Sequence, residues 1–497
     1  MTAYQQLEEK FRTLATLGDA VGILHWDAAT MMPTASAEDR SEQLTALTAI
    51  SHDMLVSTET GDLLDEASGD NTLTDWQHAN LREMHRRYIH ATAVETSLVT
   101  ALSKATNACE TGWRTARADK DYDAVKPLLA EVLLLSKEAA AAKAAKLYCS
   151  PYEALMDQFI PGLRTATVDA LFDRLGEELP GLLSNILDHQ AAQPDVIAPK
   201  GPFPVDQQRA LGTKLMEIIG FDFKMGRLDE SLHPFSGGTP DDLRITTRYE
   251  DDDFMTGLMG VLHETGHALY EKNLPADWRR QPVGTARGMD VHESQSLLIE
   301  MQACRSLEFL TFASPLMQEA FDRSGPEWDP ENLYRVYTKV RPGLIRVDAD
   351  EVTYPLHVIL RYRLEMALLS DDLPLDDLPD AWNAEMKELL GLTPPDHKDG
   401  CLQDIHWFDG AFGYFPSYTF GAATAAQLFQ AATKADASIL PEIQAGNFKP
   451  LYAWLGDNIH RKGSLLETPE LIQGATGQEL NADIFLDHLK TRYMTTS

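Results

Sequence analysis

Apolar residues recur every three or four positions along most of the chain, the spacing that places them on one face of an α-helix. Near the N-terminus, Leu7, Phe11, Leu14 and Leu17 form such a stripe. The same spacing predicts further helices over residues 41–55, 74–104, 122–147, 290–310 and 348–369. Another is predicted to begin near Thr167. Residues 24–33 end in a proline and predict a turn, and the proline-rich residues 193–204 predict a loop.

The helical spacing is lost between residues 221 and 253. Residues 243–249 alternate and are rich in β-branched side chains, which predicts a short strand, and residues 233–238 predict a second extended piece with a turn. The sequence shows no internal repeat and no low-complexity linker, so we expect a single domain over residues 1–497. The predicted fold class is mainly α, with two helical lobes around a cleft and a small antiparallel sheet beside it.

Composition narrows the class of protein. The hydrophobic fraction of 44% and the charged fraction of 24% are ordinary for a globular domain. The net charge of −33 argues against a nucleic-acid partner and against binding to anionic membranes. We interpret it as a solvated acidic surface, with salt adaptation as the alternative.

The compartment is predicted from what the sequence lacks. The four cysteines are widely spaced and form no C-x-x-C pair, which favours a reducing environment. The N-terminal residues have no apolar signal-peptide core, and no apolar run approaches the roughly 18 residues that a membrane span needs. We therefore expect a cytoplasmic protein.

The strongest chemical signal is the sequence His263-Glu264-Thr-Gly-His267, which matches His-Glu-x-x-His. Residues four apart lie on one face of a helix, so both imidazoles can bind a single metal ion. Glu264 can then act as general base toward a water held at that metal. A chance match is expected in about one average chain of this length in a hundred. The motif therefore indicates a zinc site, and the rest of the chain must supply a third ligand.

The third ligand is predicted to be a carboxylate. In the extended zinc motif a glycine and a third histidine would follow, but this chain has Tyr270 and Asn273 at those positions. Glu293 is the best candidate, because its surroundings are polar while residues 297–301 are mostly apolar. The competing candidates are three nearby polar residues: Glu271, His292 and Glu300.

Spacing in the sequence identifies the substrate-binding residues less clearly than the metal ligands. His406, Tyr414 and Tyr418 are possible donors to a developing oxyanion, although each could equally be an ordinary packed side chain. Arginine binds a free carboxylate well because it can donate two parallel hydrogen bonds. The arginines considered are Arg244, Arg248 and Arg346, for each of which a surface ion pair is the alternative.

Taken together, these motifs resemble the carboxypeptidase Taq family of metallocarboxypeptidases, family M32. Segments 26–33 and 413–418 are also similar to the family, and the resemblance runs in order along nearly the whole chain. The six principal matches are H-P-F at 233–235, D-x-R-x-T at 242–246, H-E-T-G-H at 263–267, H-E-S-Q at 292–295, I-R-x-x-A-D at 345–350 and G-x-x-Q-D-x-H-W at 400–407.

The resemblance implies roles at particular positions. His263, His267 and Glu293 would be the ligands of one Zn²⁺ per chain, which Co²⁺ can often replace, and Glu264 the general base. Substrate contacts would come from six residues: Arg346 for the C-terminal carboxylate, Asp350 in the same motif, His406 and Tyr418 for the carboxylate or oxyanion, Tyr414 as the less favoured tyrosine, and Arg244 in the motif that closes one end of the groove.

The resemblance also implies a fold, an activity and an assembly. The fold would be of the neurolysin and angiotensin-converting-enzyme type, with a deep central groove, and the protein would be a homodimer. It would release single amino acids from the C-terminus of peptides with broad specificity. The rivals are an oligopeptidase or dipeptidyl carboxypeptidase of the same fold, and a non-catalytic scaffold. One departure stands out: Leu297-Leu-Ile-Glu-Met301 replaces the family's usual Arg-Leu-Trp-Glu-Asn, so we expect differences in packing, dimer contacts or substrate preference there.

Overall fold

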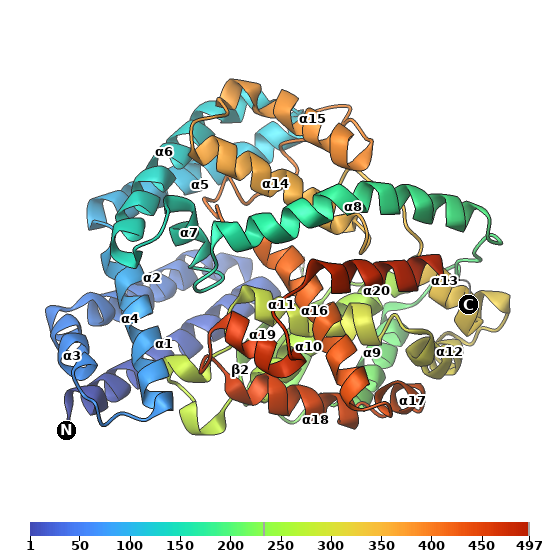
Figure 1. Ribbon diagram of the computed structural model, residues 1–497, viewed down its shortest axis with the longest axis horizontal. Coiled ribbons are helices and arrows are strands. Elements are labelled where there is room, and N and C mark those ends of the chain that lie inside the picture. The colour runs from blue at the N-terminus through green and yellow to red at the C-terminus, as the bar shows by residue number, and fades with distance from the viewer. Residues whose placement is uncertain (232–233, 496–497) are drawn as a thin grey trace.

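The computed structural model describes residues 1–231 and 234–495, and helices make up most of it (Figure 1). The helices before the sheet are α1 (Ala3–Thr30), α2 (Ala37–Val56), α3 (Thr58–Ser68), α4 (Asp75–Thr92), α5 (Thr96–Asp119), α6 (Tyr122–Leu147), α7 (Pro151–Met156), α8 (Thr165–Ala191) and α9 (Val205–Ile219). Those after it are α10 (Phe254–Lys272), α11 (Met289–Leu297), the π-helix η4 (Leu298–Ala303), α12 (Leu307–Phe321), α13 (Pro330–Tyr337), α14 (Tyr354–Leu369), α15 (Leu378–Leu390), α16 (Pro416–Ala435), α17 (Ile439–Gln444), α18 (Lys449–Asn458), α19 (Thr468–Thr476) and α20 (Ala482–Met494).

Two large hydrophobic cores account for the two lobes. One core joins α5 to α8 with α14, α15 and α20, and the other joins α9 to α13 with α17 to α19. Helix α16 contributes to both, with Phe420 and Ala423 in the first core and Ala425 and Leu428 in the second. Figure 1 shows α16 running through the middle of the molecule beside α11. The mainly helical, two-lobed prediction is confirmed, while the assignment of residues 1–497 to a single domain stays a prediction.

The sheet lies against the helix that carries the zinc motif. Its order is β1 (Gly226–Glu230), β3 (Asp242–Thr247), β2 (Ser236–Thr239), with β1 parallel and β2 antiparallel to β3. Leu243 and Ile245 of β3 are buried against Val261 and Ala268 of α10. The prediction of a wholly antiparallel sheet is therefore wrong for the β1–β3 pair. The mostly polar sequence of β1 gave no strand signal. β1 and β3 are not joined directly as a hairpin, because β2 comes between them in the chain and is the strand that pairs antiparallel with β3.

Helix α1 differs from its prediction. It continues to Thr30, through most of the stretch predicted to be a turn, and Pro33 comes three residues after its end. Proline disfavours helix mainly at its own position and at the residue before it, so it does not exclude helix over residues 24–30. Trp26 is buried between the guanidinium groups of Arg227 and Arg244, whose carbon atoms lie 4.7 and 4.3 Å from its ring. These contacts from the sheet hold this part of α1 in place.

Three other predicted helices are interrupted or shortened. Residues 93–95 separate α4 from α5 without a glycine or proline, so spacing alone could not locate the break. Residues 304–306 separate η4 from α12, whose N-cap is Ser306. Helix α14 begins only at Tyr354, because residues 349–353 form a turn around Asp350. The predicted loop at residues 193–204 is present, and His233 of the predicted extended piece lies outside the described residues.

The sequence also predicts that no segment spans a membrane and that the cysteines are free thiols. Within residues 1–231 and 234–495, no helix combines the length and apolarity that crossing a membrane requires. All four cysteines are free, and three of them are buried: Cys109, Cys304 and Cys401.

Candidate metal centre and substrate groove

Helix α10 carries two of the three predicted metal ligands. Asp253 caps its N-terminus by accepting hydrogen bonds from the backbone N–H groups of Met255 and Thr256. Because residues four apart share a helix face, His263 and His267 point in the same direction. Their ring centroids lie 4.9 Å apart.

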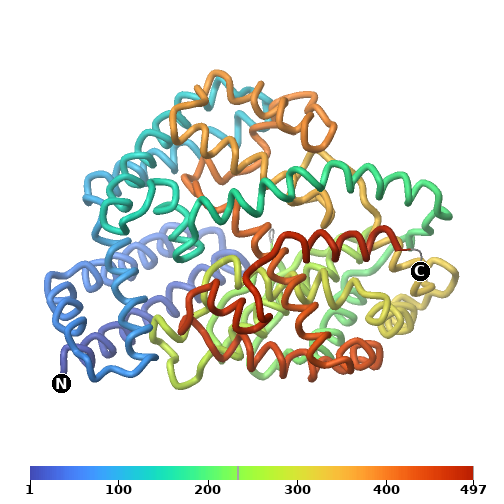
Figure 2. The backbone as a smooth tube through the Cα atoms, viewed as in Figure 1, coloured from blue at the N-terminus to red at the C-terminus, as the bar shows by residue number. Residues whose placement is uncertain are grey.

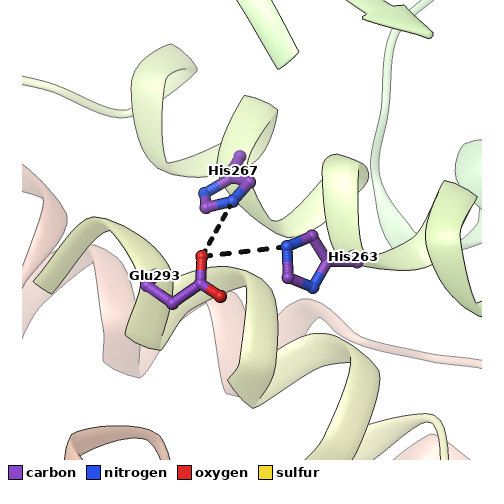
Figure 3. Close-up of side chains that lie close together, drawn as sticks. All are labelled: His263, His267 and Glu293. Carbon is purple, nitrogen blue, oxygen red and sulfur yellow. Dashed lines mark ion pairs between the residues drawn. The ribbon is translucent and has the colours of Figure 1, made fainter. Parts of the chain in front are cut away.

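The third predicted ligand, Glu293 on α11, points toward both histidines (Figure 3). Its Oε2 atom lies 3.8 Å from Nε2 of His263 and 3.4 Å from Nε2 of His267. The ligand atoms of the three side chains all lie within 4.8 Å of one another. Two segments that are 26 or more positions apart in sequence thus bring three ligand atoms to one point.

Two glycines let the helices approach closely enough for this convergence. A Cβ atom on Gly266 of α10 would lie 2.6 Å from the backbone oxygen of Gln295, and one on Gly421 of α16 would lie 2.8 Å from Cγ of Glu293. Real Cβ atoms do not approach other atoms so closely. Helix α11 is therefore held between two glycine-bearing helices, and Gly421 supports the Glu293 side chain from behind.

The competing ligand candidates occupy other positions. Oε2 of Glu300 lies 2.9 Å from Nδ1 of His263, the ring nitrogen that faces away from Glu293. His292 stacks on His267 and its Nε2 lies 2.9 Å from Oε1 of Glu271. Glu300 therefore orients a histidine, which is the usual role of a carboxylate behind a metal-binding imidazole. Nδ1 of His267 has no hydrogen-bond partner among the described residues.

Burial and neighbouring charges set the ionisation of the cluster. Burial raises the pKa of Glu264 to about 7, with His263 opposing this and Glu293 adding to it. For Glu293, burial is outweighed by His263 and His267, and the pKa falls to about 2. For His263, burial is outweighed by Glu293 and Glu300, and the pKa rises to about 10. Burial lowers the pKa of His267 to about 4. Glu293 thus stays ionised and His267 neutral at pH 7, the forms in which each can bind a metal.

The donor set fits a catalytic divalent metal. Two imidazole nitrogens and one carboxylate oxygen are a familiar set for catalytic zinc, which keeps a further position for water or substrate. Glu300 supplies the orienting hydrogen bond to His263. The convergence of the three ligand atoms and the hydrogen bond between Glu300 and His263 therefore both suit a metal ion such as zinc.

The segment before α16 and the first turn of that helix place aromatic donors beside this cluster. Nε2 of His406 lies 3.4 Å from the hydroxyl of Tyr418, and the rings of Tyr414 and Tyr418 lie 5.3 Å apart. Burial lowers the pKa of His406 to about 4, so its ring is neutral at pH 7. Tyr418 lines a cavity together with His263 and Glu293, whereas Tyr414 packs edge-on against Phe159. Of the two tyrosines, Tyr418 is the one that faces the metal ligands.

Arg346 is buried behind Tyr418. Its Nε and Nη2 atoms donate to Oδ1 of Asp404 at 3.0 and 2.8 Å, and Nη1 donates to the hydroxyl of Tyr354. The guanidinium carbon lies 4.8 Å from the centre of the Tyr418 ring. Arginine has five N–H donors, so with three engaged about two remain for a ligand. Asp404 is shared with Arg361, whose side chain is fully buried.

Arg244 and Asp350 are engaged in other contacts. Arg244 pairs with Asp242 and stacks on Trp26, and it does not line the cavity. The Asp350 carboxylate accepts hydrogen bonds from the backbone N–H groups of residues 341, 352 and 353. Asp350 therefore shapes the turn that follows Arg346, although it also borders the cavity. The alternative Arg248 pairs with Glu250 on the surface.

The cavity beside the metal ligands has a volume of about 840 Å³. Its walls come from α10, α11, η4, the turn before α14, and the loop before α9. Tyr354 lines it and accepts a hydrogen bond from Arg346, and no motif in the sequence indicated a role for this residue. In the sequence it lies inside the helix predicted over residues 348–369, four positions after the I-R-x-x-A-D motif, with nothing to single it out.

Known proteins resemble the chain over nearly its full length. The sequence pattern described as Carboxypeptidase Taq (M32) metallopeptidase matches residues 6–493. Thermostable carboxypeptidase 1 of Thermus thermophilus is 38% identical, over 99% of this chain and 98% of that protein. Carboxypeptidase 1 of Bacillus subtilis is 33% identical over the same shares.

Solved structures of carboxypeptidases have the same fold as this chain. Metallocarboxypeptidase 1 of Trypanosoma cruzi is 39% identical and superimposes with a TM-score of 0.97, covering 99% of each chain. The M32 carboxypeptidase of Deinococcus radiodurans R1 is 33% identical with a TM-score of 0.92, covering 99% of this chain and 98% of that one. The motifs, the fold and the His-His-Glu cluster agree with these similarities. The chain therefore belongs to the carboxypeptidase Taq (M32) family of metallopeptidases.

Proposed function

We propose that this enzyme is a zinc-dependent carboxypeptidase that releases single amino acids from the C-terminus of peptides with broad preference. The observation that carries the proposal is the position of Tyr418. It lines one cavity with His263 and Glu293, and its ring packs on the guanidinium of Arg346. The last peptide bond and the terminal carboxylate of a substrate belong to the same residue, so a carboxypeptidase needs its metal and its carboxylate-binding cation close together.

His263, His267 and Glu293 would hold the zinc ion. When bound, zinc would act as a Lewis acid on the scissile carbonyl and favour ionisation of a water molecule. Glu264, next to His263 on α10 and 7% exposed, takes the proton of the attacking water and delivers it to the leaving amine. Glu300 keeps the His263 ring in the orientation that directs Nε2 toward Glu293.

The remaining residues bind the substrate. Arg346 donates its free N–H groups to the terminal carboxylate, and Asp404 fixes the guanidinium in position. Tyr418 donates its hydroxyl to the developing oxyanion, with His406 beside it to orient that hydroxyl. Tyr414 packs against Tyr418 and contributes to this wall.

The proposal distinguishes this enzyme from an oligopeptidase or dipeptidyl carboxypeptidase of the same fold. In those enzymes the groove would extend further past the scissile bond. Here Arg346 would stop the peptide one residue beyond that bond. The motif that contains Arg244, which lies outside the cavity and is held on Trp26, would limit the peptide's length at the other end of the groove.

Mass spectrometry of peptide products tests the reaction, its direction and its metal dependence together. We expect a ladder of single-residue losses from peptides with a free C-terminus and very little from the same peptides amidated. A chelator should stop the reaction, and added zinc or Co²⁺ should restore it. Release of dipeptides or internal fragments would favour the rival enzymes, and activity that survives complete metal removal would contradict the site.

Location and assembly stay predictions of the sequence. We propose a cytoplasmic protein that forms a homodimer and has no nucleic-acid or membrane partner. Sedimentation of the purified full chain should give twice the mass of 55.3 kDa; a monomer at micromolar concentration would contradict the predicted dimer.

A further inference from the structure

A buried carboxylate that is distant in sequence from the zinc motif, but lines the same cavity as His263, joins the C-terminal helix to the metal site. Glu351 is 5% exposed and has four side-chain partners. Its Oε1 atom lies 3.0 Å from Nε2 of Gln302 and 2.9 Å from Nε2 of His488. Its Oε2 atom accepts hydrogen bonds from Arg492 at 3.1 Å and from the hydroxyl of Tyr493 at 3.0 Å. Three of these partners are on α20, and Gln302 is on the π-helix η4.

The charge of Glu351 is compensated within the protein. Burial alone would raise its pKa, but His488 and Arg492 outweigh burial and hold the pKa well below its usual range. A buried carboxylate with four partners is costly to disturb, because removal of one partner leaves the others unsatisfied. The contact between α20 and η4 is therefore fixed by polar interactions as well as by apolar packing.

Arg492 also acts on the backbone of η4. Its Nη1 atom donates to the carbonyl oxygen of Met301, and its Nη2 atom donates to that of Gln302 at 3.3 Å. Carbonyl groups at the end of a helix lack intrahelical partners, and a π-helix is a rare form that needs such support. One guanidinium thus holds the end of η4 and Glu351 together.

The helix η4 carries the residue that orients a metal ligand. Glu300 lies two positions before Gln302 and contacts Nδ1 of His263 at 2.9 Å. A shift of η4 along its axis would move Glu300 relative to that ring. An unbroken series of contacts therefore runs from Arg492 through η4 and Glu300 to His263.

Figure 2 shows the C-terminal helix running from the middle of the molecule toward its right-hand side, and α20 contacts both α8 and α16. We propose that α20 positions the metal site, with Arg492 and Glu351 as positioning residues that hold η4 so that Glu300 orients His263. The inference rests on the proposed function only in that His263 binds a metal.

The test measures zinc affinity of the full chain by competition with a chromogenic chelator, without peptide. We expect Arg492→Met to raise the zinc Kd about tenfold, the lower end of the range seen when outer contacts of zinc ligands are removed. Arg492→Lys keeps the charge but cannot serve both carbonyl groups and Glu351 at once, so we expect a smaller rise of about threefold.

The matched control is Arg174→Ala, which breaks another ion pair of α20, that between Arg174 and the exposed Asp483 at 3.0 Å. This pair is on the surface, and we expect the zinc Kd to change by less than about twofold. Zinc affinity unchanged in Arg492→Met, with only the melting temperature lowered, would overturn the inference. If Arg492→Met does not fold, unchanged affinity in Arg492→Lys would overturn it equally. A wild type that binds zinc but hydrolyses no peptide would overturn the proposed function and leave this inference standing.

Discussion

The metal-binding cluster and the arginine network behind Tyr418 are built in opposite ways. The ligand atoms of His263, His267 and Glu293 converge at 3.4 and 3.8 Å, which is longer than a usual hydrogen bond. They are arranged to share a partner more than to bind one another. In the network, Arg346 and Arg361 both bind Asp404, with N···O distances of 2.5 to 3.0 Å.

The difference shows how the protein would divide two tasks, hydrolysis at the metal and recognition of the peptide's C-terminus. In the proposed reaction the cluster would use its ligand atoms for a metal, and neighbours such as Glu300 would orient them. In the network most hydrogen bonds are made within the protein, and the three contacts of the Arg346 guanidinium leave at most two of its N–H groups for the proposed substrate. A rigid, nearly saturated arginine would define the end of the peptide, while the cluster would supply the chemistry.

The largest expected effect comes from the general base. Glu264→Gln removes the carboxylate that accepts the water proton but keeps its size, so we expect kcat/KM to fall about 10³-fold. The zinc Kd should stay within about threefold, because Glu264 is not among the ligands. Steady-state kinetics and chelator competition on one preparation measure both. Unchanged peptide hydrolysis would contradict the proposed role.

Disruption of the arginine network should act mainly on stability. Asp404→Asn leaves Arg346 and Arg361 buried without their shared anion, and we expect the free energy of unfolding at pH 7 to fall by about 3–5 kcal/mol. Urea unfolding monitored by circular dichroism measures it. The control is Asp483→Asn, at an exposed ion pair, which should cost less than about 1 kcal/mol.

The difference in stability between wild type and Asp404→Asn should depend on pH. Burial would raise the pKa of Asp404, but Arg361 and Arg346 outweigh burial and hold it well below its usual range. An acid with a lowered folded-state pKa stabilises the protein above its unfolded pKa, about 3.9, and this contribution is lost as the pH falls through the folded value. The gap between wild type and Asp404→Asn should therefore narrow below about pH 4. A gap that stays constant into that range would show that the ion pairs are not its source.

The smallest expected effect concerns the support of Glu293. In Gly421→Ala the new methyl group would meet Cβ and Cγ of Glu293 at less than 3.0 Å, so that side chain must shift. We expect the zinc Kd to rise about tenfold, as for the loss of an outer contact. The matched control is Gly181→Ala on α8, where a Cβ meets nothing within 4 Å. There the zinc Kd should not change and stability should rise by up to about 1 kcal/mol. Equal zinc affinity in both variants would mean that Gly421 does not support the ligand.

The same contrast explains what the sequence could and could not reveal. His263 and His267 lie on one helix, so their convergence follows from helical spacing alone. Glu293 comes from a second helix, and spacing left it in competition with Glu271, His292 and Glu300. The family resemblance singled out Glu293, and in the structure its contacts with both histidines, with α11 packed between Gly266 and Gly421, separate it from the others.

The arginine network was harder still to anticipate. Asp404 is 58 positions from Arg346, and Glu351 is 141 positions from Arg492. No local pattern predicts which charges will meet across such separations. The strand β1 and the continuation of α1 to Thr30 were missed for a related reason, since both depend on contacts with distant segments.

The central claim is that Arg346 recognises the free C-terminus while the metal cluster performs hydrolysis. The most direct test is the ratio of kcat/KM for one peptide as its free acid and as its amide, measured in wild type and in Arg346→Met. The ratio is independent of how much of each preparation is folded. We expect at least about a hundredfold preference for the acid in wild type, from two charge-assisted hydrogen bonds, and a ratio near one in the variant. An undiminished preference in Arg346→Met would contradict the account.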